Sequence, residues 1–136
     1  MELLRKYVQG DKPIQFRMLG NPESCLSGFR KGTNFEDENM NIELPIFSIH
    51  GNHDDPTGEG LLSPLDLLAT SGLLNYFGRS NTVDSVEIKP LLLQKGKTRV
   101  ALYGLGHIHD ERLFRLFRDD KVTWYRPEGT VENSDC

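Results

Sequence analysis

The sequence predicts an α/β fold, and three observations support this prediction. Short apolar runs rich in β-branched and aromatic residues alternate with segments of helical periodicity. Glycines and prolines fall between these segments, as they do in compact α/β domains. The chain shows no internal repeat, and its 136 residues suit one domain at most. Because strands alternate with helices, we expect a layered sheet of the α/β class.

The N-terminal part is expected to form a helix, a strand and a long loop. Apolar residues at helical spacing over 3–8 predict a helix that has no capping residue at its start and ends near Gly10. An alternating pattern then predicts a short strand over 13–19. Residues 20–42 are dominated by Gly, Asn, Ser and charged side chains. A loop of this length is uncommon in a compact domain and is usually functional or mobile.

A strand and a helix are expected next. The apolar run over 44–49 is rich in β-branched and aromatic residues and predicts a buried parallel strand. A helix start follows at Ser63, a capping residue, with Pro64 in the first turn and Asp66 where the helix dipole favours an acid. We expect this helix to end at Gly72. The segment between the two elements therefore begins at the carboxyl end of a strand, where open α/β sheets present their ligands.

In the last third of the chain, apolar and β-branched runs predict strands over 83–88, 91–94 and 99–103. Asp110 is a suitable capping residue for a final helix. This helix is expected to bury one apolar face, made of Leu113, Phe114, Leu116 and Phe117.

Composition excludes several classes of protein. Hydrophobic residues make up 37% of the chain, which together with 13 glycines argues against wholesale disorder. No apolar stretch approaches the ~20 residues of a transmembrane helix, and the first residues lack the order of a signal peptide. The two cysteines, Cys25 and Cys136, predict free thiols in a reducing, intracellular compartment. The formal net charge of -4, taken alone, argues against a polyanionic partner.

The most informative stretch is Asn52-His53-Asp54, which directly follows the strand predicted over 44–49. An Asn oxygen is a neutral hard ligand that suits Mn²⁺ or Mg²⁺, and an adjacent His can donate a proton or a hydrogen bond to a phosphate oxygen. Asp54 is then placed to fix the tautomer of the imidazole. The same residue types are ordinary turn formers, so a purely structural turn stays open as an equal alternative.

A longer match makes this stretch specific. Residues 47–58 read FSIHGNHDDPTG and resemble the third phosphodiesterase motif of the nuclease subunit of the eukaryotic double-strand-break repair complex. This is the meiotic recombination eleven family, whose members are calcineurin-like metallophosphoesterases. Further matches lie at 93–96, 101–106 and 110–113, in the family's order and spacing, so that the resemblance covers roughly residues 1–134.

The resemblance implies a fragment of the layered α/β/β/α metallophosphoesterase fold and a nuclear role in DNA double-strand-break repair, meiosis and homologous recombination. Members of this family cut DNA as exonucleases and endonucleases with two Mn²⁺ ions. Carried onto this sequence, the resemblance implies that Asn52 is a metal ligand and that His53 contacts the scissile phosphate and protonates the leaving oxygen. Asp54 would support His53.

One ligand does not make a two-metal site. The family's early Asp-x-His, its Gly-Asp motif, a following histidine motif and the closing Gly-His-x-His are absent at their expected places in the order. We therefore expect residues 1–136 to be a partial metallophosphoesterase (nuclease) domain with a divergent tail at 135–136. The isolated chain is expected to be inactive as a nuclease.

Gly106-His107-Ile108-His109 spells the closing metal motif of the family, and two histidines at this spacing can bind a metal. However, no other histidine lies between His53 and His107, although the family's order requires one. The flanking residues match a family segment that needs no histidine. We therefore expect His107 and His109 not to be ligands.

The resemblance also implies partners: DNA, a second copy of the chain, the SMC-like ATPase subunit of the repair complex, and nibrin, with no membrane. The loop at 20–42 resembles the latching loop that helps the nuclease dimerise and receives nibrin, and Phe35 and Asn41 fall in it. Leu65 and Leu68 lie on a helix that joins a four-helix dimer interface in this family. Simple core packing is the alternative for these leucines.

Three functional hypotheses stay open. The first is part of a Mn²⁺-dependent DNA nuclease, for which the five basic against two acidic residues over 79–99 offer contacts to phosphates. The second is a metallophosphoesterase for small phosphoesters that uses Asn52 and His53 together with His107 and His109. The third is a non-catalytic fragment that dimerises or binds nibrin.

Overall fold

The structure is a computed structural model that describes residues 1–127. It confirms the mixed α/β class, while the tail expected at 135–136 lies outside the described residues. No helix in the described part is long and apolar enough to cross a membrane. The elements, in chain order, are α1 (Glu2–Val8), β1 (Arg17–Leu19), the short 3-10 helices η1 (Pro22–Ser24) and η2 (Asn34–Glu36), β2 (Phe47–Ser48), α2 (Pro64–Thr70), β3 (Asn75–Tyr76), β4 (Val86–Ile88), β5 (Leu91–Lys95), β6 (Thr98–Leu102), α3 (Asp110–Arg118) and β7 (Val122–Trp124).

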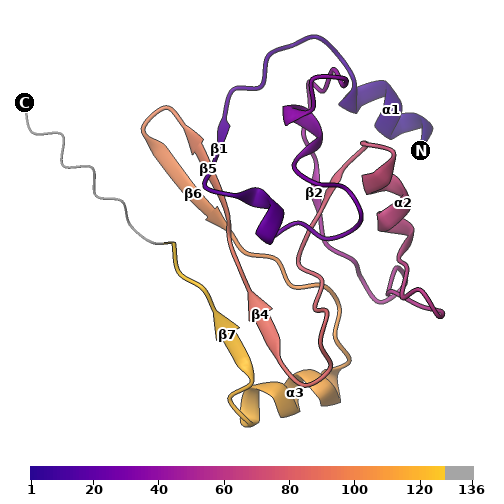
Figure 1. The fold of residues 1–136 in the computed structure, drawn as a ribbon, viewed down its shortest axis with the longest axis vertical. Helices are drawn as coiled ribbons and strands as arrows, with labels where there is room; N and C mark the ends of the chain where they lie inside the picture. Colours follow the sequence, from indigo (N-terminus) through magenta and orange to yellow (C-terminus); the bar gives the residue numbers. More distant parts are fainter. Residues whose placement is uncertain (128–136) are drawn as a thin grey trace, which may run out of the picture.

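The strands form three small sheets. β1, β5 and β6 make an antiparallel sheet in which Leu93 lies opposite both Met18 and Val100. β2 pairs with β3, and β4 pairs with β7, both in parallel. Gly96, in the turn between β5 and β6, has φ 56°, which glycine adopts without a Cβ penalty. In Figure 1, α3 lies beside the β4–β7 pair at one end of the molecule, and α2 lies beside β2 towards the other. The layered α/β/β/α arrangement stays a prediction.

The first two helices agree closely with the sequence prediction. α1 has no side-chain cap and ends before Gly10, as expected. α2 begins with a capping box: Leu65 N–H donates to Ser63 Oγ at 3.1 Å, and Ser63 N–H donates to Asp66 Oδ2 at 2.8 Å. It ends before Gly72, whose φ of 73° stops the helix.

The loop over 20–42 is fastened to the rest of the molecule. Asn34 is fully buried, and its backbone N–H donates to Asn75 Oδ1 at 2.8 Å. Asn75 Nδ2 donates back to Asn34 Oδ1 at 2.8 Å, and Asn34 Nδ2 donates to the carbonyl of Gly72 at 2.8 Å. Leu26 also forms a bridge with Phe77. These buried hydrogen bonds tie the loop to β3 and to the end of α2.

Two apolar clusters and a chain of aromatic rings make up the core. One cluster packs α2 against β3 through Leu65, Ala69, Leu74 and Tyr76, and the other packs α3 against β4 through Val86, Ile88, Ile108 and Leu116. Phe47 lies between these elements and the N-terminal half. Its ring contacts the rings of Phe16, Phe35 and Phe77 at centroid distances of 6.4, 6.2 and 6.4 Å.

Several expectations for the strands need correction. The strand predicted over 13–19 forms only at Arg17–Leu19, and the buried strand predicted over 44–49 forms only at Phe47–Ser48, which is half-buried. β3 and β7 were not predicted; each holds two or three residues, too few for an alternating pattern to stand out.

The expected cap and buried face of the last helix also need correction. The capping position is His109 rather than Asp110, which is the first helical residue. Leu116 is buried and Leu113 packs beside it, but Phe114 and Phe117 are 67% and 52% exposed. Helical periodicity defines two neighbouring apolar stripes here, and only one of them faces β4.

Candidate functional site

The loop after β2 presents the two principal candidate residues. β2 and β3 run in parallel, and backbone N–H groups of Asn75 and Phe77 donate to the carbonyls of Ile46 and Ser48 at 2.7 and 3.0 Å. The chain then makes a tight turn in which Asp54 N–H donates to the Gly51 carbonyl at 3.3 Å. Asn52 and His53 occupy this turn and are both exposed. Their side chains are therefore free to reach a ligand at the carboxyl end of the sheet.

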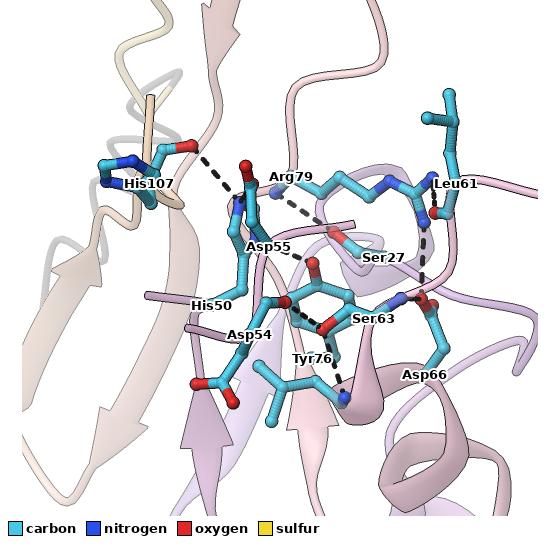
Figure 2. Close-up of polar contacts among 11 residues, drawn as sticks. Ser27, His50, Asp54, Asp55, Leu61, Ser63, Asp66, Tyr76, Arg79 and His107 are labelled. Carbon is cyan, nitrogen blue, oxygen red and sulfur yellow. Dashed lines mark hydrogen bonds and ion pairs between the residues drawn. The ribbon is translucent and has the colours of Figure 1, made fainter. Parts of the chain in front are cut away.

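Asp54 ties the turn to α2. Its backbone carbonyl accepts a hydrogen bond from Ser63 Oγ at 2.7 Å, so the residue that caps α2 also fixes the end of the turn (Figure 2). Within residues 1–127, no hydrogen bond joins the Asp54 carboxylate to the His53 ring. The supporting role of Asp54 toward His53 stays a prediction.

His50 is a residue of the site that the sequence reasoning missed. Its side chain is 5% exposed, and its Nδ1 lies 2.7 Å from the hydroxyl of Tyr76 (Figure 2). Its Nε2 lies 3.5 Å from Asp55 Oδ1 and 3.4 Å from the carbonyl oxygen of His107. We assign the ring proton to Nε2, which faces these two oxygens, so that Nδ1 accepts from Tyr76. The sequence feature that could have pointed to His50 is its place directly after the predicted strand.

The backbone around His50 is equally well held. His107 N–H donates to the His50 carbonyl at 3.0 Å, and Gly106 N–H donates to the Gly78 carbonyl at 2.7 Å. Gly106 has no room for a side chain, because a Cβ there would lie 2.0 Å from the His50 ring. The start of the turn is thus wedged between β3 and the segment that leads into α3.

Tyr76 connects this histidine to a buried ion pair. Burial, and then the negative charge of Asp66, raises the pKa of Tyr76 to about 12, so the phenol stays protonated and able to donate to His50. Asp66 is 2% exposed and lies 3.5 Å from Nη1 of Arg79. Arg79 Nη2 in turn donates to the carbonyl of Leu61 at 2.6 Å. The ion pair ties α2 to the segment after β3 and acts on Tyr76 through its charge.

The described residues do not fit a complete two-metal centre. Asn52 supplies one amide oxygen, but residues 1–127 contain no group of three or more His, Cys, Asp or Glu that is placed to hold a metal ion. The rings of His107 and His109 lie next to each other, with centroids 5.2 Å apart.

The predicted partner-binding residues lie in different environments. Phe35 is half-buried among Phe16 and Phe47, and Leu65 is part of the core around α2. Leu68 is half-buried against that core. Asn41 is exposed, and its Nδ2 donates to Asp11 Oδ1 at 3.0 Å. Their roles in partner binding stay predictions.

Comparison with known proteins gives a consistent result, although no protein-family model matches the chain. The human double-strand break repair protein MRE11 is 55% identical over 136 residues, covering 98% of this chain. The double-strand break repair protein mus-23 of Neurospora crassa is 50% identical over 127 residues, covering 93% of the chain. The Arabidopsis thaliana MRE11 protein is 44% identical over 133 residues, covering 94% of the chain.

The chain spans about a fifth of the length of these relatives: 19% of the human protein, 17% of mus-23 and 18% of the Arabidopsis protein. The similarity runs through the candidate turn and through all three small sheets, since it covers nearly the whole chain. The chain is therefore homologous to a segment of the double-strand break repair proteins of the MRE11 family.

Proposed function

We propose that this chain is part of a Mn²⁺-dependent DNA nuclease that hydrolyses phosphodiesters in double-strand break repair. The observation that carries the proposal is the tight turn after β2, which exposes Asn52 and His53 within a chain homologous to the MRE11 family. In this proposal Asn52 is a ligand of one Mn²⁺ ion. His53 contacts the scissile phosphate and gives a proton to the leaving oxygen.

The buried network supports this assignment because catalytic side chains need a fixed backbone. The hydrogen bond between Tyr76 and His50 and the hydrogen bond from Ser63 to the Asp54 carbonyl hold the two ends of the turn. Between them, only Asn52 and His53 project freely. Such preorganisation lowers the cost of placing a ligand and an acid against a phosphate.

The remaining metal ligands, in this proposal, come from the four-fifths of the relatives that the chain does not match. The isolated chain is accordingly inactive, and the complete protein works in the nucleus with DNA, a second copy, the SMC-like ATPase subunit and nibrin. Among the basic residues over 79–99, the exposed Lys95, Lys97 and Arg99 supply contacts to DNA phosphates, whereas Arg79 is held by Asp66.

The test replaces the matching segment of human MRE11 with this chain and measures cleavage of duplex DNA across a range of Mn²⁺ concentrations. We expect the chimera to cleave DNA, and we expect Asn52→Ala to shift half-maximal activity to a Mn²⁺ concentration at least about tenfold higher. His109→Ala is the matched control and leaves the Mn²⁺ requirement unchanged. An unchanged requirement in the Asn52→Ala chimera would contradict the ligand role.

A second candidate function is a non-catalytic dimerisation segment, which one observation favours. Leu67 on α2 is 73% exposed, and the neighbouring Leu61 and Leu62 are 57% and 45% exposed. Two positions apart on α2, Leu67 and Leu65 point to opposite sides of the helix, so Leu67 faces away from the core cluster that holds Leu65. Sedimentation of the chain and of Leu67→Asp tests this candidate: a dimer that the substitution dissociates supports it, and a monomer in both cases refutes it.

A further inference from the structure

The segment that joins β6 to α3 holds two histidine side chains that the proposed nuclease role does not use. His107 is half-buried and His109 is exposed, and their rings are 5.2 Å apart with an interplanar angle of 74°. Within residues 1–127, no hydrogen bond or ion pair uses a ring nitrogen of either residue. Both imidazoles are therefore available to a ligand.

The backbone holds this pair in place from both sides. Ile108, between the two histidines, is 8% exposed and packs in the cluster with Val86 and Leu116. Because successive side chains of an extended segment point to opposite faces, His107 and His109 lie on one outer face. His107 N–H donates to the His50 carbonyl at 3.0 Å, and the His109 carbonyl accepts from Leu113 N–H at 2.9 Å, in the first turn of α3.

The spacing of the rings suits a metal with imidazole ligands. Zn–N bonds of about 2.0–2.1 Å place each ring centroid roughly 3.2 Å from the ion, so two rings at a tetrahedral angle have centroids roughly 5.2 Å apart. The observed separation has this value. Asp110 and Glu111 follow in the first turn of α3 and add negative charge near the pair.

We propose that His107 and His109 form a surface site for a divalent transition metal of the zinc type, with water in the remaining positions. Imidazole pairs favour Zn²⁺ over Mn²⁺, because affinity for nitrogen ligands rises along the first-row series. The site uses neither Asn52 nor His53 and does not depend on the nuclease proposal. It departs from the expectation that these two histidines are not ligands, which rested on the family's motif order and on the flanking residues.

The test is calorimetric titration of ZnCl₂ into the untagged 136-residue chain. We expect one Zn²⁺ per chain, a loss of at least about tenfold in affinity in both His107→Ala and His109→Ala, and unchanged binding in the matched control His53→Ala. Mn²⁺ should bind at least about tenfold more weakly than Zn²⁺. Zn²⁺ should also raise the melting temperature of the wild type and of His53→Ala but not of His109→Ala.

Folding of each variant is checked by circular dichroism, and His107→Gln replaces His107→Ala if the half-buried position needs a longer side chain. Because His109 is exposed and its backbone carries the helix contact, His109→Ala leaves the fold intact. No Zn²⁺ binding by the wild type would overturn the proposal. So would full binding by a folded His109→Ala chain, or loss of binding in His53→Ala.

Discussion

Replacing Tyr76 by Phe tests whether the buried hydrogen bond to His50 holds the candidate turn. Tyr76 is 1% exposed and His50 is 5% exposed, and their polar atoms are 2.7 Å apart. Phe fills the same space, so no cavity forms, but His50 Nδ1 loses its donor in a place that water does not reach. A buried acceptor without a partner costs about 1–3 kcal/mol. We therefore expect the free energy of unfolding to fall by about 2 kcal/mol.

The assay is urea denaturation of the 136-residue chain, followed by far-ultraviolet circular dichroism. With an m value of about 1–3 kcal/mol per molar urea, the midpoint should fall by roughly 1 M while m stays constant. Tyr7→Phe is the matched control, because Tyr7 is 55% exposed, and its midpoint should not move. A midpoint for Tyr76→Phe equal to that of the wild type would refute the assigned role of this hydrogen bond.

Three further predictions follow from the same structure. The pKa of Tyr76 is raised from 10.0 to about 12 in the folded chain. The free energy of unfolding should therefore be unaffected by this group below pH 10 and should fall by up to about 3 kcal/mol as the pH rises toward 12, because the unfolded chain loses the phenol proton first. Urea denaturation measures this alkaline loss, which should be absent in Tyr76→Phe. Ser63→Ala removes the cap of α2 and the hydrogen bond to the turn, so the free energy of unfolding should fall by about 1–2 kcal/mol in the same assay. The exposed Ser71→Ala should cost less, and equal effects of the two substitutions would argue against the cap. Phe47→Ala should lower the melting temperature in a calorimetric scan, at a cost of about 2–3 kcal/mol for this half-buried ring that contacts three others, whereas Phe29→Ala, 73% exposed, should have little effect.

Local chemistry explains which elements could be predicted from the sequence. The start of α2 follows from Ser63 and Asp66, because a capping box depends only on residues a few positions apart. β3 and β7 could not be predicted, since a strand of two or three residues exists only through its partner. The buried face of α3 was partly misassigned because periodicity does not say which stripe faces β4, and Phe114 lies on the outer one.

In the candidate site, too, some residues can be proposed from local sequence and others only from the fold. Asn52 and His53 could be proposed from the sequence, because adjacent residues after a strand carry the chemistry and the family motif; their roles stay predictions. His50 was missed because its role depends on Tyr76 and His107, which are far along the chain and meet it only in the fold. The spacing between the rings of His107 and His109 likewise comes from the fold, although their order in the sequence was visible.

The central claim is that His53 provides the acid of a DNA nuclease. The most direct measurement is the rate of Mn²⁺-stimulated cleavage by the chimera that carries this chain in human MRE11, with and without His53→Ala, at saturating Mn²⁺. We predict that the substitution lowers the rate by about 10²–10⁴-fold, the usual contribution of a general acid, while DNA binding is retained. A His53→Ala chimera that cleaves DNA at the unmodified rate would contradict the claim.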